Sequence, residues 1–406
     1  MQDMTPNHET DILIAGAGPA GLAAACVLGA AGHSVTLVDP AAPVTGEDAP
    51  GADLRTTALL QPARVLLETA GAWEGLARHA MPLDVMRIVD AAATPPVIRD
   101  FVASDIGLDS FGWNVPNWLL RRELLARVTD MPQVTTRFGH PVAGLLLREA
   151  GAYVRLSDGT AITAALVIAC DGADSPLRRM AGIGARRINH DQVALVLAVE
   201  HDMPHGNIST EVHRQGGPFT LVPLPDRDGR HRSAVVWMDE AEAQSRRRAL
   251  PPAALAAEVQ DRSAGVLGPL HPVGQVAGWP IRSVLADRLT ARRFALAGEA
   301  AHAMPPIGAQ GLNTSLSDIA QLRDLCAEGD PGDGDRLATY QRRRWPVLAT
   351  RMAGIGALNA ASRTGLAPLQ VLRAHGLAVI HDVAPLRRAM MRLGLAGRPG
   401  GTETPR

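Results

Sequence analysis

A strand, a helix and a second strand follow one another closely at the start of the chain. Residues 11–15 are a short apolar run, residues 19–31 are rich in alanine and leucine, and residues 34–39 return to apolar and β-branched side chains. Residues 40–53 then have the composition of a loop. Apolar runs of these lengths in this order predict one βαβ unit.

Later patterns predict a second sheet and a helical C-terminal region. A hairpin is expected from residues 153–156 and 162–169, joined by the turn Ser-Asp-Gly at 157–159. The other expected elements are helices at 57–69, 118–128 and 312–326, and strands at 85–90, 192–200, 218–224, 233–238 and 294–297. From residue 336 onward the pattern is mostly helical, with breaks expected at Pro346, Gly365, Gly376 and Pro385.

Composition excludes several function classes. The 406 residues are 46% hydrophobic and carry a net charge of -1, so the chain can bury a large core and has no overall field that attracts nucleic acid. Aromatic residues are only 3%, which argues against a base-stacking surface. Every basic residue is an arginine, and the absence of lysine excludes a Walker lysine and a Schiff-base lysine.

The cysteines and the N-terminus add little chemistry. Cys26, Cys170 and Cys326 are far apart and lack metal-ligand spacing, so we predict buried, inert thiols and no metal site. The first ten residues are polar, and no apolar run in the chain is long enough to span a bilayer. We therefore expect a cytoplasmic protein that does not cross a membrane.

The motif GAGPAG at residues 16–21 follows the first strand and opens the first helix. In this setting Gly16 permits a tight turn, Gly18 lets a pyrophosphate approach the backbone, and Gly21 lets the helix pack on the strand. Asp39 ends the second strand, where a carboxylate would hold the hydroxyls of a ribose. These features predict a dinucleotide site without distinguishing FAD from NAD.

Two later segments favour a flavin. Asp171 and Gly172 follow an apolar strand, and alone they would be an ordinary turn; Gly298 and Glu299 follow another strand. A loop comes next, and the residues that we expect to face the flavin ring or support this loop are Pro305, Pro306, Gly308, Gly311, Leu312 and Asn313. Glycines let backbone lie against a flat ring, and a helix starting near Leu312 would aim its positive end at the negative charge of a reduced flavin.

These motifs, with the strand and helix pattern, predict an α/β fold with a discontinuous Rossmann-like FAD-binding domain. We assign residues 1–75, 100–180 and 282–330 to that domain, and residues 76–99 and 181–281 to an inserted β-sheet domain for the substrate. C-terminal helices are expected at 331–396, with a tail at 397–406.

At these residues the chain resembles the class A flavoprotein monooxygenases, the fold group of para-hydroxybenzoate hydroxylase. The glycine motif, Asp171-Gly172 and residues 298–313 match the three flavin signatures of that family in order. The resemblance covers most of the chain and is closest to the ubiquinone-biosynthesis hydroxylases of the alphaproteobacterial type. The segments that carry this closer match are RTTAL at 55–59, MRIVD at 86–90, PPIGAQGLN at 305–313 and HDVAPLRR at 381–388.

The resemblance implies roles for individual residues. Arg55 would lie against the flavin and its phosphates, Asn117 takes the place of a polar residue at the head of a helix near the cofactor, and Glu299 would hold the ribityl or phosphate part. Relatives mostly have aspartate at the position of Glu299 and glycine at that of Ser315. A histidine at the position of His302 belongs to the cofactor loop of several relatives, which favours a structural role over that of a general base.

The implied reaction hydroxylates the aromatic ring of a polyprenylated phenol or quinol in ubiquinone biosynthesis, through a flavin C4a-hydroperoxide. FAD is the implied cofactor, NAD(P)H or another donor the reductant, and O2 the co-substrate. We assign no catalytic acid or base, because the flavin carries the chemistry. A hydroxylase of small soluble aromatics, a prenyl reductase on the same fold, and a non-enzymatic flavin-bound subunit stay open as alternatives.

The C-terminal region bears on the expected partners. Residues 366–395 interleave apolar side chains with arginines, which predicts either packing on the flavin domain or a helix in the headgroup region of a membrane. The resemblance adds the inner-membrane surface and a ubiquinone-biosynthesis complex as expected partners. Nucleic acid is not expected.

Overall fold

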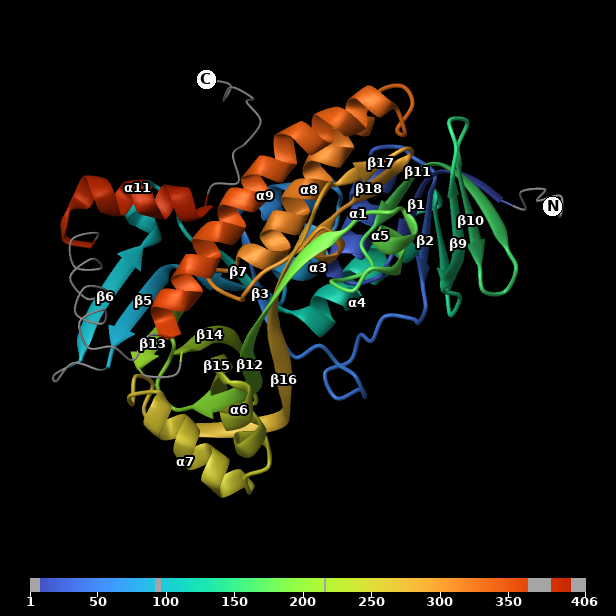
Figure 1. The fold of residues 1–406 in the computed structure, drawn as a ribbon. Helices are drawn as coiled ribbons and strands as arrows, with labels where there is room; N and C mark the ends of the chain where they lie inside the picture. Colours follow the sequence, from blue (N-terminus) through green and yellow to red (C-terminus); the bar gives the residue numbers. More distant parts are fainter. Residues whose placement is uncertain (1–7, 92–95, 215–216, 364–380, 396–406) are drawn as a thin grey trace.

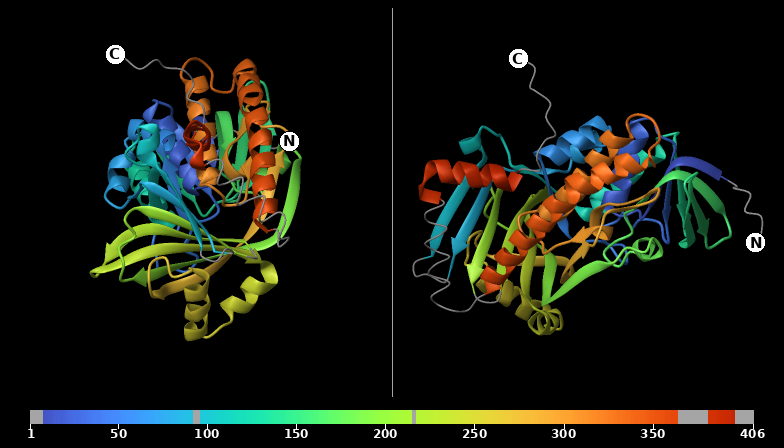
Figure 2. Two further views of the ribbon diagram at one scale, coloured as in Figure 1. Left: turned by 90° about the vertical axis from the view of Figure 1, so that its left-hand side faces the viewer. Right: turned by 45° about the horizontal axis from the view of Figure 1, so that its top comes forward.

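A computed structural model describes residues 8–91, 96–214, 217–363 and 381–395 of the chain. It consists of a mainly parallel sheet and a mainly antiparallel sheet, each of eight strands, and a small three-stranded sheet, with helices packed around them (Figure 1). Views from two other sides show helix α7 lying on the opposite side of the antiparallel sheet from the long helix α9 (Figure 2).

The first sheet contains the βαβ unit expected from the sequence. Strand β1 (His8–Ala15) pairs in parallel with β2 (Val35–Asp39), and helix α1 (Pro19–Ala30) connects them. The sheet has the order β17-β18-β11-β1-β2-β8 with β10 and β9 added at β11, and its other strands are β8 (Val134–Phe138), β9 (Val142–Leu147), β10 (Ala152–Leu156), β11 (Ala161–Ala169), β17 (Thr290–Ala291) and β18 (Phe294–Leu296). The expected hairpin of residues 153–169 is the antiparallel pair β10–β11.

The second sheet is formed largely by the segment between β11 and β17. Its order is β19-β16-β12-β15-β14-β13-β5-β6, and its strands are β5 (Val85–Asp90), β6 (Val97–Val102), β12 (Ala185–His201), β13 (Ile208–Arg214), β14 (Gly217–Arg227), β15 (Arg230–Glu240), β16 (Leu270–Ala286) and β19 (His302–Ala303). Helices α6 (Ala241–Arg248) and α7 (Pro252–Arg262) cover its outer face. There Leu255 and Val259 of α7 pack on Phe219 and Trp237 of the sheet.

The third sheet, in the order β3-β7-β4, lies between the other two. Its strands are β3 (Thr56–Leu60), β4 (Met81–Leu83) and β7 (Gly112–Pro116). Nearby are the helices α2 (Gln61–Thr69), α3 (Trp73–Ala77), η1 (Ala103–Ile106) and α4 (Asn117–Thr129). The prediction of one helix over residues 57–69 is wrong in its first part, because residues 56–60 pair with β7 and the Asn313 side chain bonds to the backbone of Ala58 and Leu60.

Of the remaining helices, α5 (Pro176–Met180) lies between β11 and β12 in sequence, and the others come after β18. They are η2 (Gly298–Ala300), α8 (Gln310–Cys326), α9 (Gly334–Arg363) and α11 (Ala384–Leu395). The expected break at Pro346 is wrong, since α9 continues through it while the flanking Trp345 donates to the Ala286 carbonyl and Leu348 is fully buried. Pro385 lies in the first turn of α11, where proline is compatible with a helix.

Several expectations concern residues or boundaries beyond these elements. Gly365, Gly376 and residues 397–406 lie outside the described residues. The domain boundaries stay a prediction.

All three cysteines are buried as expected, and burial raises the pKa of the Cys26 and Cys326 thiols to about 12. Among the described helices, none has the length and apolar character needed to cross a membrane.

Candidate cofactor and substrate site

A cavity of about 670 Å³ extends from the carboxyl ends of β1 and β2 to the inner face of the second sheet. The predicted site residues that line it are Gly16, Gly18, Asp39, Arg55, Asn117, Asp171, Gly172, Glu299, Pro306, Gly308, Gly311 and Leu312. Gly21, Gly298, Pro305 and Asn313 do not line this cavity. A volume of this size is typical of small-molecule and cofactor sites.

The glycines of the first turn have different structural roles. A Cβ on Gly21 would lie 1.7 Å from the Gly16 carbonyl oxygen, and one on Gly16, at φ +105°, would lie 2.4 Å from the Cys170 carbonyl oxygen. Both glycines are therefore required for the fold. A Cβ on Gly18 would meet no atom within 4 Å, so this position leaves open space at the start of α1. Asp39 holds the turn, because its carboxylate accepts hydrogen bonds from the backbone N–H groups of Ala17 and Ala41.

Arg55 and Asn117 are joined by an acid that was not expected from the sequence. Asp53 is 1% exposed and accepts two hydrogen bonds from the Arg55 guanidinium, at 2.7 and 2.8 Å, and one from Asn117 at 3.1 Å. Arg121 on α4 approaches the same carboxylate at 3.4 Å. Asn117 begins α4, as expected for a polar residue at a helix head, and its backbone N–H donates to the Arg55 carbonyl.

The charges in this cluster keep Asp53 ionised. Burial raises the pKa of the Asp53 carboxyl, but the hydrogen bonds and charge of Arg55 outweigh burial and the pKa lies below its usual value. Arg55 is therefore fixed in place, with its guanidinium 4.1 Å from the centre of the Trp279 ring and its Nη1 3.9 Å from Glu299. This arrangement brings Arg55 and Glu299 together at the cavity wall.

Asp171 and Gly172 directly follow β11 and also line the cavity. Gly172 has φ +86°, a left-handed conformation that favours glycine. The Asp171 Oδ2 accepts from the Leu177 backbone N–H at 3.1 Å, whereas its buried Oδ1 has no partner among the described residues. Burial raises the pKa of this carboxyl. This oxygen is therefore left as an acceptor for a group other than the described residues.

The first turn of α8 forms another part of the cavity wall. Gln310, Gly311 and Leu312 all line the cavity, and the turn contains no acidic residue, so its N–H groups present partial positive charge there. Asn313 lies behind this wall, where its side chain accepts from the Leu60 N–H and donates to the carbonyls of Ala58 and Ala309. This residue therefore ties β3 to the start of α8.

A buried ionic network lies beneath the loop that precedes α8. His302 donates from Nε2 to Asp318 at 2.7 Å, and Arg344 of α9 contacts the other carboxylate oxygen of Asp318 at 2.6 Å. Asp318 also accepts from the Gly298 N–H at 3.2 Å. Asp318 and Arg344 were not expected from the sequence. One signal was available, because Asp318 interrupts the apolar face that α8 forms with neighbouring Ile319 and Leu322.

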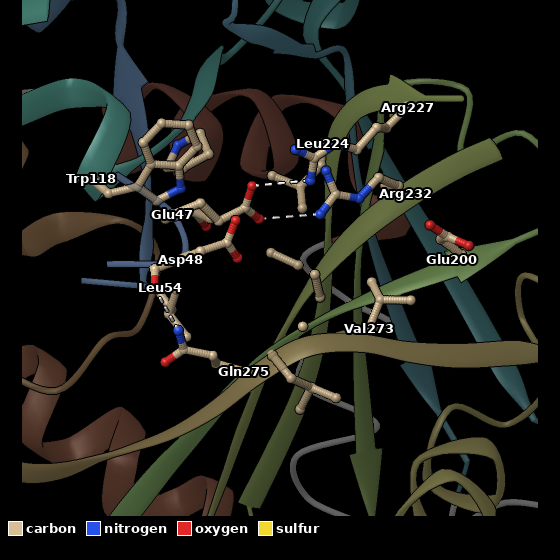
Figure 3. Close-up of a pocket in the computed structure, with 16 residues that line it drawn as sticks. Glu47, Asp48, Leu54, Trp118, Glu200, Leu224, Arg227, Arg232, Val273 and Gln275 are labelled. Carbon is tan, nitrogen blue, oxygen red and sulfur yellow. Dashed lines mark hydrogen bonds and ion pairs between the residues drawn. The ribbon is translucent and has the colours of Figure 1, made fainter. Parts of the chain in front are cut away.

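A smaller pocket of about 120 Å³ separates the loop of residues 40–55 from the second sheet (Figure 3). Glu47 on the loop pairs with Arg227 and Arg232 on the sheet, each at 3.2 Å. Gln275 adds a 3.4 Å hydrogen bond to the Asp48 carbonyl. The loop that ends at Asp53 and Arg55 is therefore anchored to the second sheet.

We expect Glu47→Gln to weaken this anchor and raise the dissociation constant for FAD by roughly two- to fivefold, since partly exposed ion pairs contribute at most about 1 kcal/mol. Fluorescence titration of the apoprotein with FAD at low and high salt would measure it. Wild-type affinity at both salt concentrations would show that the anchor does not support Arg55.

A larger effect is expected at the start of α8. A Cβ on Gly311 would meet no atom within 4 Å, so Gly311→Val leaves the fold intact while its side chain enters the cavity. We expect at least roughly tenfold weaker FAD binding or slower hydroxylation, equivalent to about 1.4 kcal/mol. Flavin titration and circular dichroism would separate the site from the fold, and a variant with wild-type binding and turnover would exclude this loop from the ring site.

These residues fit FAD. The open space at Gly18 accommodates a pyrophosphate at the start of α1, and the Asp171 Oδ1 and Arg121 Nε atoms are buried polar groups without partners among the described residues. Asp39, Arg55 and Glu299 supply polar contacts between these points.

Comparisons with known proteins agree with this geometry. A family model described as "FAD binding domain" matches residues 9–353. The chain is 32% identical to the ubiquinone hydroxylase UbiL of Rhodospirillum rubrum, covering 98% of this chain and 92% of that protein. It is 27% identical to the 3-demethoxyubiquinol 3-hydroxylase of Escherichia coli, covering 96% and 99%.

Solved structures show the same fold. The p-nitrophenol 4-monooxygenase PnpA of Pseudomonas putida superposes with a TM-score of 0.80 at 19% identity, covering 97% of this chain and 100% of that one. The flavin-dependent monooxygenase PieE, solved with FAD and substrate, gives a TM-score of 0.72 at 22% identity, covering 96% and 72%. The chain therefore belongs to the FAD-binding-domain family of flavin-dependent monooxygenases.

Proposed function

We propose that this FAD-dependent monooxygenase hydroxylates the aromatic ring of a polyprenylated phenol or quinol intermediate of ubiquinone biosynthesis. The names of two relatives that match nearly along their whole lengths, ubiquinone hydroxylase and 3-demethoxyubiquinol 3-hydroxylase, support this substrate class. NAD(P)H or another donor is the reductant, and O2 supplies the oxygen atom.

The observation that carries the proposal is the continuity of the large cavity. One end is the polar glycine turn, and the other end lies against the second and third sheets, where the lining is mainly apolar with Ser209, Glu211 and Thr220 among it. The apolar residues of that second end are Leu83, Met86, Phe111, Val222, Val236, Met304 and Pro306. A cavity with these two ends accommodates a dinucleotide cofactor and a ring with a hydrocarbon substituent together.

The protein contributes binding, orientation and exclusion of water. Bound FAD supplies the oxygen-activating chemistry. Arg55, held by Asp53, orients the cofactor, while Pro305 and Pro306 form a loop segment without backbone N–H donors, which suits a dry site. The apolar lining keeps water from the reacting ring.

Contact with the membrane surface is a further part of the proposal. Helix α11 packs on η1 through Met391, which is buried with Ala103 and Phe111, and through the 3.0 Å ion pair of Arg387 with Asp105. Its outer side is apolar and basic. The exposed residues of this side are Leu386, Arg388, Met390 and Arg392. Phe111 also lines the large cavity, so α11 adjoins the apolar end of the site.

We expect the full chain to float with vesicles that contain anionic lipid, and the double variant Arg388→Gln/Arg392→Gln to bind them roughly thirtyfold more weakly, since each basic residue near such a surface contributes about 1 kcal/mol. Arg246→Gln/Arg248→Gln on α6 is a matched control that should bind normally. Equal binding by all three proteins would exclude α11 as the contact.

The substrate proposal is tested with FAD-loaded enzyme, NAD(P)H and phenols that differ only in prenyl-chain length. Mass spectrometry should find a hydroxylated product whose yield increases with the chain. Turnover of short-chain phenols alone would indicate a hydroxylase of small soluble aromatics. A product with two added hydrogens and no oxygen would indicate a prenyl reductase, and no product would leave a flavin-bound accessory subunit.

A further inference from the structure

The apolar end of the cavity contains one polar side chain whose hydrogen-bonding capacity is only half used. Asn114 on β7 is fully buried, and it lines the cavity. Its Nδ2 donates to the Pro223 carbonyl of β14 at 2.8 Å. Its Oδ1 is buried and has no hydrogen-bond partner among the residues that the structure describes.

The hydrogen bond to Pro223 determines which way the amide points. If the nitrogen and oxygen were exchanged, Oδ1 would face the Pro223 carbonyl oxygen, and two acceptors would meet without a proton between them. The amide nitrogen is therefore fixed toward β14. The oxygen is the atom left for another partner.

The strand register places Asn114 on the cavity side of its sheet. Asn114 lies opposite Ala58 of β3 and opposite Met81 of β4. Residues two apart on a strand share a face, so Leu60 and Leu83 lie on the same face as Asn114. Ala58, Leu60 and Leu83 all line the cavity, as does Asn114 itself.

We propose that Asn114 recognises the substrate by accepting a hydrogen bond from a phenolic hydroxyl group on its ring. The inference rests on the proposed function, which puts an aromatic ring at this end of the cavity. Buried acceptors without partners cost free energy, and a phenol O–H is the donor that a phenolic ring carries into an apolar chamber. Asn114 is thus a specificity-determining residue that favours rings with a free hydroxyl.

The test compares two ring ligands of nearly equal shape, 2-prenylphenol and 1-fluoro-2-prenylbenzene, of which only the first donates a hydrogen bond. Their dissociation constants are measured on FAD-loaded full-length protein from the change in flavin absorption. We expect the wild-type protein to prefer the phenol by about tenfold.

Two variants test whether Asn114 causes that preference. Asn114→Leu, which removes the acceptor, should abolish it. Thr220→Val removes another polar side chain of the cavity and should retain it. FAD affinity should be unchanged in both.

Other results would overturn the inference. One is an undiminished preference in Asn114→Leu. Another is that Asn114→Leu loses affinity equally for both ligands, or loses affinity for FAD, which would indicate a purely structural or cofactor role. A third is loss of the preference in Thr220→Val. A phenol that binds with the expected preference and is not hydroxylated would instead contradict the proposed function while leaving the recognition by Asn114 standing.

Discussion

Gly18→Val is expected to give a folded protein that cannot hold FAD. A Cβ at Gly18 meets no protein atom within 4 Å and the backbone φ is -70°, so the chain accommodates valine. The two methyl groups then occupy the space at the start of α1 where a pyrophosphate would approach the N–H groups. We expect an affinity loss of roughly a hundredfold or more, equivalent to about 3 kcal/mol, and a colourless purified protein.

The control separates a blocked site from a broken fold. Gly334→Val, at the exposed start of α9, makes the same substitution in open space away from the cavity and should leave the protein yellow. Gly21→Val should prevent folding, because its Cβ would lie 1.7 Å from the Gly16 carbonyl oxygen. A yellow Gly18→Val protein with normal FAD content would show that the cofactor phosphates lie elsewhere.

Asp318→Asn is expected to cost about 3–5 kcal/mol of the free energy of unfolding, because it leaves the buried Arg344 without its counter-charge. Asp318 is fully buried and holds together the cofactor loop through His302 and Gly298, and α9 through Arg344. Chemical denaturation of the apoprotein at pH 7 would measure the loss. An unchanged midpoint would show that this network does not support the fold.

The measurement is made at pH 7 because of the direction in which the pKa of Asp318 is shifted. Burial raises the pKa of Asp318, but the charges of Arg344 and His302 outweigh burial and the pKa lies below its usual value. A carboxyl whose folded pKa is lowered stabilises the protein fully above its unfolded pKa of about 4, and the effect is lost as the pH falls through the folded pKa. The same substitution at the exposed Asp174, paired with Arg187, should change stability by less than about 1 kcal/mol.

The cofactor end of the molecule was predictable because its signals are local. The GAGPAG turn lies between a strand and a helix that their own apolar patterns define, and Asp39 lies at a strand end, so the sequence indicates the fold and the site together. Asp171-Gly172 and Gly298-Glu299 also follow strands of the parallel sheet, β11 and β18, which places them at the same edge of it.

What the sequence could not predict depends on contacts between distant segments. Residues 56–60 run directly into helix α2, and they become a strand because β7 and Asn313, which is more than 250 residues away in the chain, satisfy their backbone groups. From the sequence alone Asp53 is an ordinary acid in a loop. Its role follows from Asn117 and Arg121, which lie against it in the folded chain. The role of Asn114 depends on Pro223, a partner on a different sheet.

The most direct test of the central claim is oxygen labelling. FAD-loaded enzyme is supplied with NAD(P)H, a polyprenylated phenol and ¹⁸O2, and the products are analysed by mass spectrometry. We expect a ring-hydroxylated product that contains one ¹⁸O atom, with one NAD(P)H consumed for each product formed. Consumption of NAD(P)H and ¹⁸O2 that yields only hydrogen peroxide, or a product whose added oxygen comes from water, would contradict the account.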